Sequence, residues 1–312
     1  MSLLRSTTAR LIITAAILAY LLRSIDLGAS LHAMLRVDPW WFAFTLLLVA
    51  ADRLLMAVRW LLLLRAADVD IPARSALRIF LTSSFVGGFL PAGVGADAAR
   101  AYEVASRTSR GSQAVASVGI DRVLGLVAIA ILGIAGLATY APHVEPALRT
   151  QLMVVAALGG AATLAVFWVD KLTRVCLPAR WHDTKWGWRI LRLGDAIGAY
   201  RRHPSVLLQV MALSIAVQLI RVFQGYGLGR GLAIEVDLSY YLVFMPIAML
   251  LLLLPVSISG FGLPQAVIVW LLRPVGVPDA ESLAFSTLLI VIGIIGNLPG
   301  ALLYVVRRKP VT

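Results

Sequence analysis

The chain has 312 residues, of which 60% are hydrophobic and only 14% are charged. A soluble globular domain is about 45–50% apolar and about a quarter charged, so one or two water-soluble cores cannot bury this much apolar surface. Together with a mean hydropathy of +0.88, the composition indicates an all-α polytopic membrane protein.

The net charge of +12 arises from 28 Lys and Arg residues against 16 Asp and Glu residues. In a soluble protein this balance would suggest nucleic-acid binding, but in a membrane protein it arises because basic residues gather in cytoplasmic loops. We therefore expect no nucleic-acid partner. Cys176 is the single cysteine, which excludes an internal disulfide and a multi-cysteine metal site.

Six apolar segments are long enough to cross a membrane, since a helical span needs about 20 predominantly apolar residues. They lie at about residues 10–28, 39–64, 114–141, 150–170, 204–228 and 283–306. Two further apolar stretches, about 75–103 and 239–272, are interrupted by the sequences VGGFLPAGVG and LPVSISGFGLP. Broken backbone at membrane depth is tolerated where protein or a wet cavity surrounds it, so we predict two re-entrant helical hairpins.

The order span, hairpin, span occurs twice, over residues 39–141 and 204–306. The Leu-Pro pairs of the two hairpin tips start at Leu90 and Leu254, which are 164 positions apart. The two units would enter the membrane from opposite sides, so we predict an inverted-topology repeat within one transmembrane domain. In transporters built this way, the site lies between the broken helices near the membrane midplane.

Loop charges predict the orientation. If neither hairpin crosses the membrane, both termini and the basic segment 171–203 fall on the cytoplasmic side, as the positive-inside rule requires. That segment interleaves Trp181, Trp186 and Trp188 with basic residues, which is typical of a helix lying at the headgroup layer.

Charged side chains at membrane depth are candidate functional residues, because each costs about 2.5–3.5 kcal/mol on insertion scales. The candidates are Asp52, Arg53, Arg59, Asp97, Arg100, Asp121, Arg122 and Arg221. Five arginines against three aspartates leave two positive charges over, which a lipid phosphate would balance, and the planar guanidinium suits phosphate.

Simpler roles compete for several of these residues. Asp97 and Arg100 are three apart and can form a local pair on one helix, while Asp121 and Arg122 can pair or extend toward the interface. Asp52 and Arg53 are sequence neighbours, so we expect each to have a different partner.

The hairpin tips supply small residues and helix breakers. The candidates there are Pro91, Gly95, Pro255, Ser257, Gly260 and Gly262. Helix N-termini at such breaks carry partial positive charge and bind anions. Helix packing through small residues is the alternative.

Enzyme signals are weak. The four histidines are scattered without metal-ligand spacing, and there is no GxxxxGK[ST] motif for ATP. We therefore expect no catalytic residue, metal or cofactor, and transport driven by a gradient or by ions, with Asp52, Asp97 and Asp121 as candidate proton carriers.

Paired motifs at the two hairpins resemble a known family. The first comprises Phe89-Leu90-Pro91-Ala92, then Gly95, Asp97, Arg100 and Tyr102, then Asp121-Arg122 with Gly125; the second comprises Leu254-Pro255, Ser257, Gly260 and Gly262. Over nearly the whole chain the sequence resembles the lysylphosphatidylglycerol synthase transmembrane, or flippase-like, family. It departs from the family pattern at Ala96 and at Pro264-Gln265.

The resemblance implies a pseudo-symmetric, re-entrant fold that moves or binds lipids in the bacterial cytoplasmic membrane. The soluble aminoacyl-transferase half of two-domain members is not expected here, and neither is lysyl-lipid synthesis. The leading hypothesis is flipping of a lipid with an anionic headgroup held by Arg53, Arg59 and Arg100. The alternatives are a non-transporting partner that presents a lipid or polyprenyl carrier to a separate glycosyltransferase or lipid-modifying enzyme, a lipid-headgroup transferase, and a small-anion carrier. Identity of the lipid, direction, coupling and oligomeric state are left open.

Overall fold

The protein is all-α in the part of the chain that the computed structural model describes, residues 26–88, 94–108, 110–139, 168, 171, 184–252 and 263–307. No strand occurs in these ranges. The helices are α2 (Leu27–Leu35), α3 (Pro39–Ala66), α4 (Ala73–Gly88), α5 (Val94–Arg107), α6 (Gly111–Thr139), α10 (Lys185–Ala199), α11 (Pro204–Gly231), α12 (Leu238–Leu252), α13 (Leu263–Leu272) and α14 (Asp279–Arg307), with 3-10 turns η4 (Tyr200–Arg202) and η5 (Arg273–Val275). The predicted fold class is confirmed.

Three helices are long and apolar enough to span a membrane: α6, α11 and the Asp279–Val305 part of α14. They coincide with three of the predicted spans. Helix α3 is as long as α11, with 28 residues, but carries three charged residues near its middle. The predicted span 150–170 lies outside the described residues, as does nearly all of 10–28.

The predicted end of the first span, at residue 28, is wrong. Asp26 has extended backbone angles and its carboxylate accepts a hydrogen bond from the Ala29 N–H, so it caps the start of α2. A helix arriving from the N-terminal side cannot continue through such a cap.

The starts of the two central helices follow from local sequence. Asp38 accepts from the N–H groups of Trp40 and Trp41 at 2.8 and 3.2 Å, and Pro39 occupies the first turn of α3. Pro204 starts α11 in the same way. Proline suits this position because its fixed φ is helical and its missing N–H would be unbonded there.

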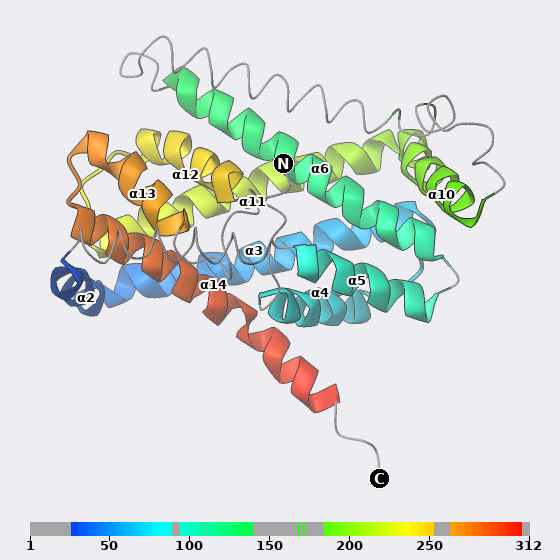
Figure 1. The fold of residues 1–312 in the computed structure, drawn as a ribbon, viewed down its shortest axis with the longest axis horizontal. Coiled ribbons are helices and arrows are strands. Elements are labelled where there is room, and N and C mark those ends of the chain that lie inside the picture. Colours follow the sequence, from blue (N-terminus) through cyan, green and yellow to red (C-terminus); the bar gives the residue numbers. More distant parts are fainter. Residues whose placement is uncertain are drawn as a thin grey trace.

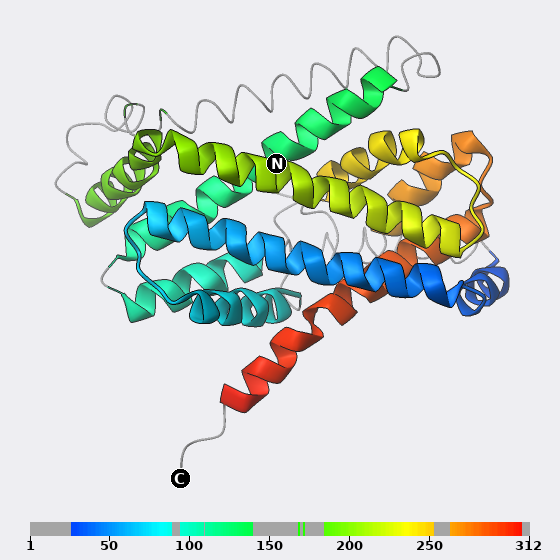
Figure 2. The same ribbon diagram turned by 180° about the vertical axis from the view of Figure 1, so that it is seen from behind.

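Helices α3 and α11 run side by side along the long axis of the molecule (Figures 1 and 2), and they form its main helix–helix contact. Helix α2 lies at one end of this axis and α10 at the other. The α4–α5 pair lies toward the α10 end and the α12–α13 pair toward the α2 end (Figure 1). The two pairs predicted as hairpins thus lie toward opposite ends of the central helices.

Both predicted units contain a long helix, two short helices and a long helix. The bounds of α3 and α11 are displaced by 165 residues, from 39 to 204 and from 66 to 231. A short helix of each unit also packs on the last long helix of the other unit. Helix α4 of the first unit packs on α14 of the second, and α12 of the second packs on α6 of the first. The opposite orientation of the units in a membrane stays a prediction.

A glycine brings the backbones together at each of these exchanged contacts. A Cβ on Gly136 of α6 would lie 2.3 Å from the Leu242 carbonyl oxygen of α12. A Cβ on Gly300 of α14 would lie 2.1 Å from the Leu81 carbonyl oxygen of α4. Each close approach therefore requires the absence of a side chain.

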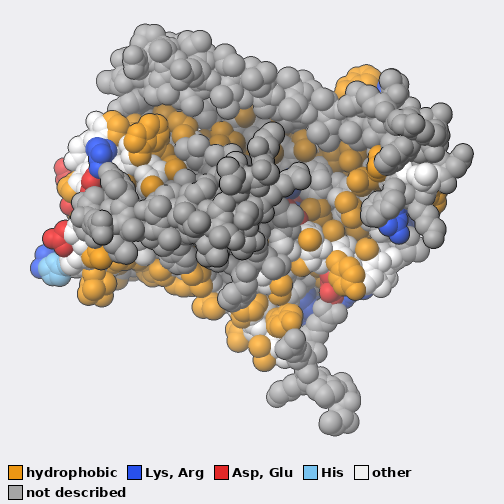
Figure 3. Space-filling view, in the orientation of Figure 1, with side chains coloured by type: hydrophobic (Ala, Val, Ile, Leu, Met, Phe, Trp, Pro, Cys, Tyr) orange, Lys and Arg blue, Asp and Glu red, His pale blue; other side chains and the backbone are white. Residues whose placement is uncertain are grey.

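Apolar side chains cover much of the surface. Figure 3 shows them over much of the described part of one face, with charged side chains mainly toward its two ends. Leu47 and Leu54 of α3 and Leu298 and Leu302 of α14 are among the exposed ones. Such a surface suits lipid rather than water.

Candidate functional site

A cavity of about 350 Å³ lies between helices α3, α4, α5, α6, α11 and α14. Five arginines line it: Arg53, Arg59, Arg100, Arg122 and Arg221. Asp97 and Asp121 line it as well, and Asp52 contacts two of the arginines at its edge. The structure thus brings together all eight charged residues that the sequence selected.

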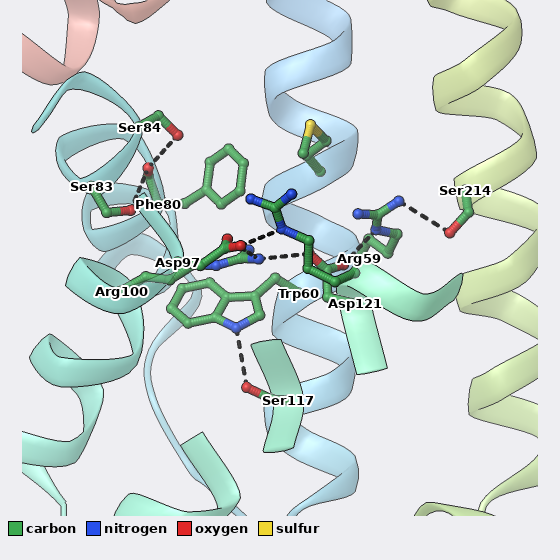
Figure 4. Close-up of polar contacts among 12 residues, drawn as sticks. Arg59, Trp60, Phe80, Ser83, Ser84, Asp97, Arg100, Ser117, Asp121 and Ser214 are labelled. Carbon is green, nitrogen blue, oxygen red and sulfur yellow. Dashed lines mark hydrogen bonds and ion pairs between the residues drawn. The ribbon is translucent and has the colours of Figure 1, made fainter. Parts of the chain in front are cut away.

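Five of them form one chain of ion pairs, here called the first cluster: Arg59, Asp121, Arg100, Asp97 and Arg122. Figure 4 labels the first four. Arg59 Nε lies 2.6 Å from Asp121 Oδ1. Arg100 Nη2 lies 2.9 Å from Asp121 Oδ2 and 2.8 Å from Asp97 Oδ1. Arg122 Nε donates to the other oxygen of Asp97. Each aspartate therefore contacts two arginines.

Two aromatic rings lie against Arg100, the central arginine of the first cluster. The Arg100 guanidinium carbon lies 5.4 Å from the centroid of the Trp60 ring and 5.8 Å from that of Phe80. Trp60 is fully buried, and its indole N–H donates to Ser117 Oγ at 3.2 Å (Figure 4). Cation–π contacts of this kind stabilise a buried guanidinium beyond its ion pairs.

Asp52, Arg53 and Arg221 form the second cluster, which joins α3 to α11. Arg221 Nε lies 2.9 Å from Asp52 Oδ1, and Arg53 Nη1 lies 3.3 Å from Asp52 Oδ2. Asp52 thus has the distant partner that we expected. The expectation of a different partner is wrong for Arg53, because its long side chain reaches back to the carboxylate next to it.

The first cluster also contacts α11. Arg59 Nη1 donates to Ser214 Oγ at 3.1 Å (Figure 4). The hydroxyl of Ser214 in turn donates to the Val210 carbonyl at 2.6 Å. Both clusters therefore connect the first predicted unit to the second.

The simpler roles considered for Asp97, Arg100 and Asp121 do not account for all of their contacts. Asp97 and Arg100 do form the local pair that we considered, but Asp97 also binds Arg122 of another helix. Asp121 is 1% exposed, so it does not extend toward an interface.

Charge in the site is unbalanced. The first cluster has three arginines and two aspartates, and the second has two arginines and one aspartate. Buried donors also lack acceptors: Arg53 Nε, Arg100 Nε and Arg100 Nη1 have none among the described residues. Buried charges and donors without partners are costly, so the site is suited to an anion.

The tip residues are only partly described. Gly95 lies in the first turn of α5, next to Ala96, and a Cβ on Gly87 would lie 2.4 Å from the Ala96 Cβ. Gly87 therefore allows α4 and α5 to meet beside the cavity. The other tip candidates lie outside the described residues: Pro91, Pro255, Ser257, Gly260 and Gly262.

Uncharged polar residues of the cavity were missed by the search for charges. They are Ser83, Ser84, Gln218 and Asn297. Helical spacing could have found Gln218, because it precedes Arg221 by three positions and so shares its helix face. In the described part of the chain no group of His, Cys, Asp and Glu could hold a metal ion.

Helix α10 has the features predicted for the headgroup layer. Trp188 is 55% exposed, and the guanidinium of Arg192 lies 4.5 Å from the centroid of its ring. Thr184 caps the helix by accepting from the Gly187 N–H at 3.0 Å. Its position at a membrane surface stays a prediction.

A comparison with protein-family models matches residues 7–300 to the lysylphosphatidylglycerol synthase TM region. The chain belongs to this family. A comparison of the sequence with curated proteins gave no match. Membership of the lysylphosphatidylglycerol synthase TM family confirms the resemblance seen in the sequence and supports a lipid-related function in a membrane. The site described above lies within the matched residues.

Proposed function

We propose that this protein flips a lipid with an anionic, phosphate-bearing headgroup across the bacterial cytoplasmic membrane. The observation that carries the proposal is the cavity, which is lined by five arginines against three neighbouring aspartates. Arginine binds phosphate through two parallel hydrogen bonds, and a site inside a membrane protein strengthens such contacts because water is scarce.

The apolar part of the lining favours a lipid over a small inorganic anion. Met56, Phe80, Leu126 and Ile129 line the same cavity as the arginines. They would contact the glycerol and the first acyl carbons while the arginines hold the phosphate. Membership of a lipid-related family supports the same choice.

Alternating access between the two units would move the headgroup. The ion pair of Asp52 with Arg221 and the hydrogen bond of Arg59 to Ser214 cross from α3 to α11. A phosphate that binds these arginines competes for the same donors, so its arrival would loosen contacts between the units. Asp52, Asp97 and Asp121 are the proposed proton carriers, and no chemical step on the lipid is proposed.

The orientation proposed from the loop charges places both termini and α10 in the cytoplasm. The α4–α5 hairpin then enters from the cytoplasmic side and the α12–α13 hairpin from the exterior. A partner enzyme that modifies or consumes the lipid would find it at either surface.

Reconstitution tests the proposal. Vesicles containing purified protein and acyl-labelled phosphatidylglycerol or phosphatidate should lose the protected inner-leaflet signal to an impermeant quencher faster than protein-free vesicles. Arg59→Ala should slow this by about tenfold, because one charge-assisted contact is lost. Arg273→Gln is the matched control, since Arg273 lies outside the cavity and pairs with Asp279 on the surface.

Rates equal to those of protein-free vesicles for every lipid would contradict flipping. If those lipids still bound tightly, the chain would instead be a non-transporting presenter of lipid to another enzyme.

A further inference from the structure

We propose that the cavity selects a lipid whose headgroup ends in a phosphate monoester over one whose phosphate is a diester. The monoester carries a charge of about −2 at neutral pH, while the diester carries one negative charge. This inference rests on the proposed function in one respect, because it assigns the ligand of the same cavity.

Each cluster contributes one unbalanced positive charge. In the first cluster three guanidinium groups are joined by two carboxylates, and in the second two guanidinium groups are joined by one. Both clusters line one cavity of about 350 Å³. A single monoester phosphate would neutralise both clusters, whereas a diester would leave one charge over.

Among the described residues of the lining, none outside the two clusters carries a negative charge. Helix α4 contributes Ser83 and Ser84, and α14 contributes Asn297, none of which ionises. The charged groups that line or border the cavity from α3, α5, α6 and α11 all belong to the two clusters. The hairpin tip sequences 89–93 and 253–262 contain no ionisable side chain. We therefore assign the balancing charge to the ligand.

The unbonded donors agree with this choice. Arg53 Nε in the second cluster and Arg100 Nε and Nη1 in the first are buried without an acceptor among the described residues. A terminal phosphate offers three strong acceptor oxygens, whereas a diester has two unbridged oxygens. A monoester could thus accept from both clusters at once.

Equilibrium binding of two lipids with identical acyl chains tests the inference. Phosphatidate and phosphatidylglycerol are titrated separately onto the purified full chain in nanodiscs of neutral lipid. At about pH 7.5 phosphatidate should bind about tenfold more tightly, and the ratio should fall toward one at about pH 5, below the second phosphate pKa of about 6. Phosphatidylglycerol keeps its charge over this range and so corrects for titration of the protein.

Variants connect the preference to the second cluster. Arg221→Gln leaves Arg53 and Asp52 balanced, so the ratio at about pH 7.5 should fall toward one while phosphatidylglycerol still binds. Arg221→Lys should keep the ratio, and Arg273→Gln should not change it. Arg53→Gln removes the same charge and leaves the ion pair of Arg221 with Asp52, which provides a second variant if Arg221→Gln fails to fold.

Three results would overturn the inference: equal binding of both lipids by the wild type at about pH 7.5, a ratio independent of pH, or an unchanged ratio in a folded Arg221→Gln. Soluble glycerol 3-phosphate binding as tightly as phosphatidate would overturn the assignment to a lipid. Selective binding without flipping would contradict the proposed function alone, and flipping without selectivity would contradict this inference alone.

Discussion

Asp121 is the carboxylate on which the first cluster depends. It is 1% exposed and contacts Arg59 and Arg100, both of which are also buried. Among the described residues Asp121 is the only carboxylate paired with Arg59, and it shares Arg100 with Asp97. Removing one member of a buried ion pair costs about 3–5 kcal/mol, because the remaining charge stays desolvated.

Asp121→Asn should therefore destabilise the protein by about 3 kcal/mol or more. Thermal unfolding of the purified variant in detergent measures the loss. Asp68→Asn is the matched control, because Asp68 is exposed and its ion pair with Arg110 is long, at 3.7 Å. Equal melting temperatures for the wild type and Asp121→Asn would contradict the role given to this carboxylate.

At the scale of the helices, two glycines allow crossing helices to come into close contact. Gly136 on α6 and Gly300 on α14 each face a carbonyl oxygen of the helix that crosses them. A methyl group at either position has no room unless the two backbones separate. The same requirement recurs in both units, which agrees with the exchanged packing of α4 on α14 and of α12 on α6.

Gly136→Ala and Gly300→Ala should each destabilise the protein by about 1–3 kcal/mol through overpacking. Gly119→Ala in α6 and Gly293→Ala in α14 are matched controls, since a Cβ at either position meets nothing within 4 Å. These controls should be neutral or slightly stabilising, because alanine favours the helix. Melting temperatures of the four variants make the comparison, and no difference within each pair would refute the close contacts.

At the scale of the whole molecule, hydropathy predicted much of the helix order. The bounds of α3 and α11 follow from proline at the first turn and from the length of the apolar run. The pairing of the charged residues could not be predicted from the sequence in the same way. Which arginine meets Asp121 depends on how α3, α5 and α6 rotate and pack, and a one-dimensional pattern does not contain that information.

The sequence also misplaced or missed local features. The start of α2 was missed because Asp26, its N-cap residue, has apolar residues on both sides and was read as part of a longer span. Ser83 and Asn297 were missed because neither carries a charge, although both line the cavity. Separate partners were expected for Asp52 and Arg53 because neighbouring residues point in different directions from a helix, but the length of the Arg53 side chain lets the two meet.

Orientation in the membrane is a property of the whole chain. With Cys176 replaced by Ser, His32→Cys on α2 and Ala199→Cys on α10 place single thiols at exposed positions near opposite ends of the molecule. The proposed topology predicts that an impermeant maleimide labels the first in intact cells, and the second only after permeabilisation. Labelling of both thiols from the same side would contradict it.

Translocation by purified protein tests the central claim most directly. In vesicles, the wild type should move an acyl-labelled anionic lipid between leaflets faster than the protein-free background, Arg273→Gln should match it, and Arg59→Ala should be slower by about tenfold. A wild-type rate equal to the background for phosphatidate and phosphatidylglycerol alike would contradict the proposal that this cavity carries a lipid across the membrane.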